Sequence, residues 1–189
     1  MTDENRADLD MLTLVSTTFS DSCLAIDGGE WDLPTPCSEW NLGQLVDHVS
    51  GGNRCTVRIL GREKGPEALA ATIQTFGEAD NRSTEVATST ERQLEAFNRA
   101  GALDETCSHL ERDLSGRELL RIRIHEMIIH TWDVVETIHP PAVIPDEAVA
   151  ELKDPESLTA QHFGILNRRM PIADSHRPQE VLLAAFGHE

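Results

Sequence analysis

Residues 117–139 read RELLRIRIHEMIIHTWDVVETIH, and the spacing of their apolar side chains decides the fold class. These side chains recur at steps of three and four residues, which is the period of one face of an α-helix. Ser115 and Glu118 have the S-x-x-E spacing of a capping box, and Pro140 and Pro141 end the pattern. We therefore predict a long helix. Its core stripe consists of Leu120, Ile124, Met127, Thr131, Val134 and Ile138.

Two segments upstream show the same helical period. In residues 9–26 the apolar side chains again recur at helical steps, and Gly28 and Gly29 end the pattern. A stretch with two prolines follows, after which Asn41 is placed to cap a second helix over residues 42–60. These segments predict two further helices of the same bundle.

Residues 67–100 form a third helical segment, whose middle is polar. Its apolar ends are separated by polar residues that include Asp80 and Ser83. Either the segment is broken into two helices, or Asp80 and Ser83 line a polar pocket inside the bundle. The sequence leaves both interpretations open.

The remaining segments complete an all-α architecture in a single domain, residues 1–189. Residues 146–155 show a weaker helical pattern, and PQEVLLAAFG at 178–187 predicts a short final helix. No stretch predicts a β-strand convincingly. We expect a bundle of four principal helices with this short extra helix at the C-terminus.

Composition excludes several classes of partner. The chain has 33 acidic and 16 basic residues, a net charge of −17, so binding to nucleic acid phosphates or to anionic membranes is disfavoured. It has no apolar run long enough to span a membrane, and its first ten residues do not resemble a signal peptide. Its four cysteines lack metal-finger spacing and are expected as reduced thiols. We expect a cytoplasmic protein.

A second stripe on the 117–139 helix carries the chemistry. Arg123, Glu126, His130 and Asp133 follow one another at helical spacing beside the core stripe. Glu126 and His130 are four residues apart, so their side chains project from one face and can share a divalent metal ion. Asp133 either accepts the second ring N–H of His130 or is a surface charge.

The string HEMIIH is not the HExxH motif of zinc proteases. His125 and His130 are five residues apart and lie on different faces of the helix, whereas the protease motif needs a spacing of four. A protease is therefore disfavoured. We expect His125 beside the site or at the surface.

The 42–60 helix offers a third ligand in His48, which lies before the glycine pair Gly51-Gly52. Glycine disfavours a helix interior by roughly 1 kcal/mol relative to alanine, so such a pair needs a packing reason. The glycines either clear space beside His48 for a metal, water or substrate, or permit a close helix crossing. Five other histidines lie in polar or proline-rich surroundings and are expected to be solvated. They are His109, His139, His162, His176 and His188.

Two motif blocks together resemble a known family. PTPCSEWNLGQLVDHVSGGN at 34–53 and RIRIHEMIIHTWDV at 121–134 are similar to the DinB-like metal-binding bundles, and more narrowly to the mycothiol-dependent maleylpyruvate isomerase N-terminal domain. RRMPIADSHRPQEVLLAAFG at 168–187 resembles the closing segment of the small single-domain members. The similarity covers essentially the whole chain.

This resemblance implies a bundle with up-down-down-up connections and one divalent metal, usually zinc. By position, the metal ligands fall on His48, Glu126 and His130. In better-known members the metal binds a small thiol cofactor such as mycothiol as its thiolate, for isomerisation or thiol transfer. From the 189 residues we expect no counterpart of the extra C-terminal domain that the full-length isomerase carries.

Further site residues follow as expectations. Asp80 and His125 are candidate proton carriers, and Arg123 is the third candidate catalytic residue. Asn53 and Arg54 are candidate cofactor-binding residues. Arg54, Arg58 and Arg123 are also candidates for binding substrate carboxylates.

The leading functional hypothesis is a zinc-dependent thiol S-transferase or isomerase that acts on a small organic substrate. The alternatives are a non-catalytic metal-binding or stress-response bundle, a metal-dependent hydrolase or lyase, and a metal-free bundle that binds a ligand or partner. The expected partners are a small-molecule substrate and a small thiol, and the expected assembly is a monomer or a homodimer.

Overall fold

Five helices and one short hairpin make up the computed structural model, which describes residues 2–37, 40–77, 81–109, 112–140, 142 and 148. The helices are α1 (Asp3–Leu24), α2 (Leu42–Leu60), α3 (Gly65–Ile73), α4 (Arg82–Asn98) and α5 (Gly116–Ile138). The strands are β1 (Thr106–Ser108) and β2 (Asp113–Ser115), which pair antiparallel.

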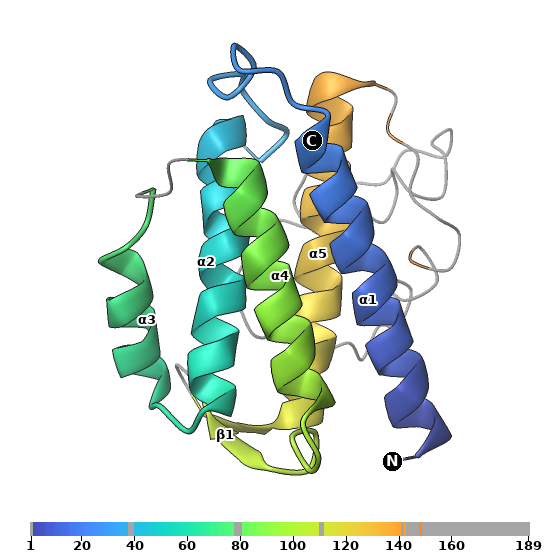
Figure 1. Ribbon diagram of the computed structural model, residues 1–189, viewed down its shortest axis with the longest axis vertical. Coiled ribbons are helices and arrows are strands. Elements are labelled where there is room, and N and C mark those ends of the chain that lie inside the picture. The colour runs from blue at the N-terminus through green and yellow to red at the C-terminus, as the bar shows by residue number, and fades with distance from the viewer. Residues whose placement is uncertain are drawn as a thin grey trace, which may run out of the picture.

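The four long helices run up, down, down and up, as the resemblance implied (Figure 1). α1 rises along α5 and α4, and α2 descends beside α4. The short α3 packs against α2 on the outside of the bundle, within the connection between the two descending helices. The all-α bundle is confirmed.

Local capping signals define the helix starts. Asn41 and Gln44 form a capping box at α2, and Ser115 and Glu118 form the predicted one at α5. Thr2 caps α1, so this helix begins several residues before the apolar pattern does. Side-chain caps act on the backbone directly, which is why they mark helix ends more closely than hydrophobic periodicity.

The polar middle of the third segment is a break rather than a pocket inside one helix. α3 ends at Ile73 and α4 begins at Arg82, where the Asn81 side chain accepts a hydrogen bond from the Thr84 amide. Ser83 Oγ donates to the carbonyl oxygen of Cys23 at 3.1 Å, so it joins α4 to α1. Asp80 lies outside the described residues.

The β1–β2 hairpin corrects the prediction from the sequence, which contained no strand. Each strand has three residues, too few for an alternating pattern to be visible in the sequence. The hairpin precedes α5 at the lower end of the bundle, where it ends in the Ser115 cap of that helix (Figure 1). The predicted helical stretches at 146–155 and 178–187 lie outside the described residues.

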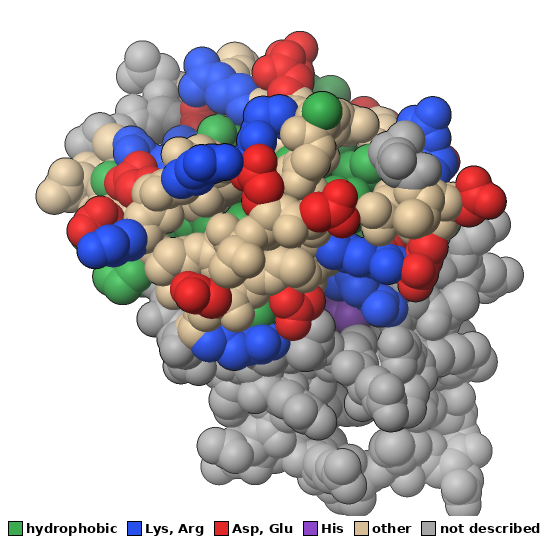
Figure 2. Space-filling view, turned by 90° about the horizontal axis from the view of Figure 1, so that it is seen from below, with side chains coloured by type: hydrophobic (Ala, Val, Ile, Leu, Met, Phe, Trp, Pro, Cys, Tyr) green, Lys and Arg blue, Asp and Glu red, His purple; other side chains and the backbone are tan. Residues whose placement is uncertain are grey.

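The charges of the lower face are mixed in sign. Figure 2 shows Lys and Arg side chains next to Asp and Glu side chains over this face. Glu105 lies between Arg99 at 3.0 Å and Arg62 at 3.5 Å.

Among the described residues, no helix is long and apolar enough to cross a membrane. Cys23, Cys37, Cys55 and Cys107 are thiols rather than disulfides, as expected.

Gly116 has very little space around it, and its replacement tests the packing of the turn at Ala102 against the start of α5. A Cβ at Gly116 would overlap the carbonyl oxygen of Ala102 and lie 2.9 Å from the carbonyl carbon. We expect Gly116→Ala to lower the free energy of unfolding by about 3 kcal/mol, the upper range for overpacking. The melting temperature should fall by roughly 10 °C in thermal unfolding.

Gly28→Ala is the matched control, because a Cβ at Gly28 would meet no atom within 4 Å. Equal melting temperatures for the two variants would show that the turn at Ala102 does not constrain the start of α5.

Candidate functional site

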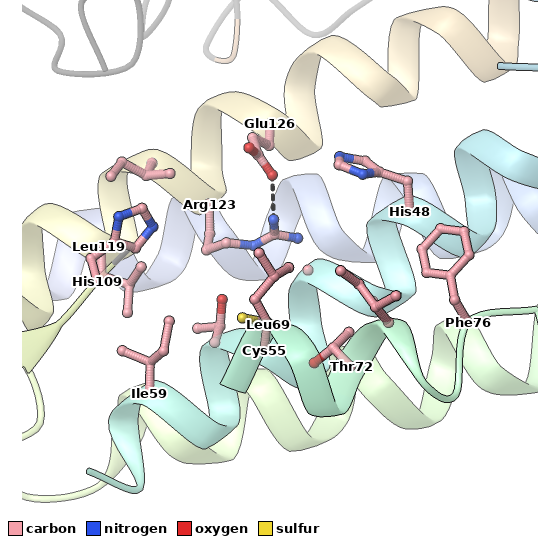
Figure 3. A pocket seen from close by; sticks show the side chains of 15 residues that line it. His48, Cys55, Ile59, Leu69, Thr72, Phe76, His109, Leu119, Arg123 and Glu126 are labelled. Atoms are coloured by element: carbon pink, nitrogen blue, oxygen red, sulfur yellow. Dashed lines mark hydrogen bonds and ion pairs between the residues drawn. The ribbon is translucent and has the colours of Figure 1, made fainter. Parts of the chain in front are cut away.

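A cavity of about 310 Å³ opens between α2, α3 and α5 (Figure 3). Its polar side chains His48, Arg123 and Glu126 face one another, and most of the remaining wall is apolar. The lining residues are His48, Gly51, Gly52, Cys55, Thr56, Ile59, Leu69, Thr72, Ile73, Phe76, His109, Leu119, Ile122, Arg123 and Glu126. The predicted ligands His48 and Glu126 thus reach one cavity from different helices.

His130 lies next to His48, although 82 positions separate them in the sequence. The two imidazole ring centres are 5.3 Å apart at an angle of 80°. Trp40 stacks on His48 with ring centres 4.2 Å apart, and lies 6.0 Å from the His130 ring. Trp40 therefore packs beside both histidines and fixes the His48 ring plane.

Asp133 orients His130. The Nδ1 atom of His130 lies 2.9 Å from Oδ2 of Asp133, whose side chain has no exposed surface. A carboxylate in this position favours the tautomer with the proton on Nδ1 and leaves Nε2 without a proton. The prediction that Asp133 supports His130 is confirmed, and its alternative as a surface charge is wrong.

Arg123 holds Glu126 from below in Figure 3. Its Nη1 donates to Glu126 Oε2, its Nη2 to Asn53 Oδ1 at 2.8 Å, and its Nε to Gln93 Oε1 at 2.9 Å. Its side chain is 4% exposed, against 19% for Glu126. This buried cation therefore has partners on α2, α4 and α5, and it fixes how the three helices meet at the cavity.

The glycine pair makes room for these groups. A Cβ at Gly52 would lie 2.5 Å from Nη1 and 3.0 Å from Cζ of Arg123. A Cβ at Gly51 would lie 3.2 Å from the Phe76 ring. The space beside His48 is therefore occupied by the guanidinium and by the segment after α3, which favours the close-packing interpretation of the pair.

The electrostatics set the protonation of the two facing groups. Burial would raise the pKa of the Glu126 carboxyl, but Arg123, His48 and His130 together outweigh it and hold that pKa below its usual range. Burial lowers the pKa of the His48 imidazole to about 4, which Glu126 only partly offsets. At neutral pH the site therefore presents a carboxylate and a neutral imidazole.

The low pKa of His48 predicts an acid-sensitive contribution to stability. Folding lowers this pKa from 6.5 to about 4, so the unfolded chain binds the proton more tightly. The stabilisation that this pKa difference gives the folded protein is complete above about pH 6.5 and is lost as the pH falls towards 4. Between pH 7 and pH 5, wild type should lose about 2 kcal/mol more unfolding free energy than His48→Gln in urea titrations.

The imidazole resonances of His48 provide a direct check by NMR. A titration midpoint near 4 is expected, and a midpoint near 6.5 in the folded protein would contradict the burial of this ring.

Three other predicted residues lie away from this cavity wall. His125 is 1% exposed and is not among the lining residues, so the expectation of a surface position is wrong. Asn53 is fully buried; it donates to Ser89 and Thr90 and accepts from Arg123. Arg54 pairs with Glu85 and lines a separate cavity of about 150 Å³ together with Arg58. Of the three predicted carboxylate-binding arginines, only Arg123 reaches the main cavity.

Two lining residues were missed. His109, expected to be solvated, lines the cavity and contributes to the low pKa of Glu126. Cys55, on α2, also lines it, and burial raises the pKa of its thiol. Cys55 lies seven residues after His48, a helical spacing that already places both on one face. Nothing in the sequence around His109 indicated its position.

In the described residues, the side chains of His48, Glu126 and His130 are not arranged around one point as metal ligands would be. Within residues 2–148, as far as the structure describes them, no group of three or more His, Cys, Asp or Glu side chains is arranged to hold a metal ion. Glu126 is turned onto Arg123 rather than shared between the two imidazoles.

Comparisons with known proteins give the family. The profile described as the mycothiol maleylpyruvate isomerase N-terminal domain matches residues 12–135, about two thirds of the chain. Proteins called uncharacterized from two strains of Mycobacterium tuberculosis are 26% identical over 163 residues, which cover 81% of this chain and 81% of theirs.

The fold also has counterparts among solved structures. The crystal structures of the mycothiol-dependent maleylpyruvate isomerase and of a histidine-to-alanine mutant superpose with a TM-score of 0.63 at 19% identity. Each match covers 78% of this chain and 67% of the other. A match at 19% identity shows that these proteins and this chain share a fold. Because the family profile spans most of the bundle, the protein belongs to the mycothiol maleylpyruvate isomerase N-terminal domain family.

Proposed function

We propose that the protein is a zinc-dependent enzyme that uses a small thiol, mycothiol being the leading candidate, to transfer or isomerise a small organic substrate. The observation that carries the proposal is that His48 and Glu126 line a cavity of small-molecule size, with the His130 ring 5.3 Å from the His48 ring. The family profile supports the thiol, since its description names a mycothiol-linked isomerase.

The donor chemistry fits a zinc ion. Two imidazoles that share a tetrahedral zinc, with Zn–N bonds of about 2.0–2.1 Å, have ring centres about 5 Å apart. The His48 and His130 rings are 5.3 Å apart. A carboxylate has two oxygens, so Glu126 can serve a metal with one while Arg123 holds the other. His48 is neutral at pH 7, as a ligating imidazole must be.

His48, Glu126 and His130 would hold the metal, whose remaining position would supply the Lewis acidity that lowers the pKa of a bound thiol. The residues of this chain supply its surroundings. Asp133 keeps the ligating nitrogen of His130 deprotonated, and Trp40 holds the His48 ring in place. Arg123 keeps Glu126 ionised, and the apolar wall limits access of water to the reacting groups.

A metal-free ligand-binding bundle is the second candidate, and one observation favours it. The Arg123–Glu126 ion pair gives the carboxylate a permanent partner without any metal. In that case the same cavity binds a ligand, and His48 and His130 are packing and hydrogen-bonding residues.

Calorimetry with mycothiol separates the two candidates. The zinc-loaded protein should bind mycothiol with one site per chain, and the metal-free protein should bind it much more weakly. A mycothiol analogue with its sulfur replaced by oxygen controls for binding of the sugar part. Equal mycothiol affinity with and without zinc, or an equally tight oxygen analogue, would contradict a metal-bound thiolate.

A further inference from the structure

The cavity has an apolar arm that the proposed zinc and thiol chemistry does not use. We define this apolar arm as Ile59, Leu69, Ile73, Phe76, Leu119 and Ile122. In Figure 3, Ile59, Leu69 and Phe76 lie across the cavity from the Glu126 carboxylate. The arm therefore continues from the polar end towards the short helix α3.

The outer part of the arm leaves apolar surface in water. Ile73 and Phe76 are 59% and 40% exposed, although both line the cavity. They lie at the end of α3 and in the turn after it, and α3 packs mainly against α2. A ligand body that covers these two side chains would remove apolar surface from water, which favours binding.

The charges of the cavity limit what the ligand can carry. Arg123 is the single Arg or Lys among the described lining residues, and its donors are already engaged by Glu126, Asn53 and Gln93. A carboxylate in the apolar arm would face leucine, isoleucine and phenylalanine side chains. Because burial of an unpaired charge is costly, the arm disfavours a ligand that is charged at both ends.

We infer that the apolar arm is the subsite for a small organic molecule with an uncharged hydrocarbon or aromatic body. The volume of about 310 Å³ lies at the small end of ligand pockets, so this body is compact. The reactive end of the molecule lies at His48 and Glu126, a placement that rests on the proposed function. The body subsite itself requires neither zinc nor thiol.

A homologous series of straight-chain 1-alkanols, from butanol to octanol, tests the subsite by ligand-observed NMR on the metal-free full-length protein. Affinity should rise roughly fourfold for each added methylene until the arm is filled. Ile73→Asn and Phe76→Ser should each flatten this dependence. Leu14→Asn is the matched control, since Leu14 is 41% exposed on α1 and should leave the series unchanged.

Thiol labelling gives a second readout within the same molecule. Cys55 lines the cavity, whereas Cys37 is also half-buried but is not among the lining residues. Octanol should slow the reaction of Cys55 with N-ethylmaleimide several-fold and leave the rate at Cys37 unchanged. Equal slowing at both thiols would indicate a general solvent effect and overturn the assignment.

The alkanol experiment and a measurement of zinc binding test two different proposals, and either can fail alone. Zinc uptake without a methylene dependence would overturn the apolar subsite and leave the metal proposal standing. A methylene dependence without zinc uptake would support the subsite and contradict the metal proposal. If alkanol affinity rises with chain length in both Ile73→Asn and Phe76→Ser as it does in wild type, the alkanols bind elsewhere. That result would overturn the subsite.

Discussion

His130→Ala should lower the affinity of the protein for zinc by more than about 100-fold, because loss of an outer hydrogen-bond partner alone costs roughly 10–100-fold. His48→Ala and Glu126→Gln should have effects of similar size, since each removes one of the three proposed ligands. Competition with a chromophoric chelator measures these affinities without reference to any enzymatic activity.

His139→Ala is the matched control for removal of an imidazole, nine residues further along the chain. His139 follows α5 directly and is exposed, so its loss should leave zinc affinity unchanged. If His130→Ala and His139→Ala have the same zinc affinity, the ligand set is wrong, and the histidine pair is structural.

Arg123→Met should lower the free energy of unfolding by about 3–5 kcal/mol, the cost of breaking a buried ion pair from one side. The substitution leaves Glu126 without its cation and removes the donors to Asn53 and Gln93. Urea unfolding of the metal-free protein at pH 7 measures the loss.

A second substitution separates charge from packing. In Arg123→Met/Glu126→Gln no uncompensated carboxylate remains, so the double variant should recover a substantial part of the stability. Arg58→Met removes an arginine whose side chain is 44% exposed and pairs with Glu63, and should cost about 0–1 kcal/mol. Equal losses for Arg123→Met and the double variant would show that the ion pair does not determine stability at the site.

Much of the bundle could be predicted because its signals are local. The stripe on α5, the capping boxes at Asn41 and Ser115, and the Glu126–His130 spacing depend only on helical period and on neighbouring residues. The end of α3 at Ile73 and the start of α4 at Arg82 did not follow from the sequence, because a polar seam fits both an interrupted helix and a lined pocket. Cap formation by Asn81 resolves this ambiguity in the structure.

The predictions that failed concern which face of each helix meets the cavity. Arg54 lies six residues after His48, which turns it away from the His48 face of α2, and it pairs with Glu85 on α4. His109 reaches the cavity through the hairpin, whose strands are too short to be predicted. The role of Gly52 depends on where Arg123 lies, and that follows from the packing of α5 against α2.

The most direct test of the zinc site is a cobalt titration of the metal-free protein, followed by addition of mycothiol. The visible spectrum should show the strong absorption of four-coordinate Co²⁺ and saturate at one ion per chain. Mycothiol should then add a sulfur-to-cobalt charge-transfer band, and His130→Ala should show neither feature. A weak, non-saturating spectrum that is the same in wild type and His130→Ala would contradict a metal site at His48, Glu126 and His130.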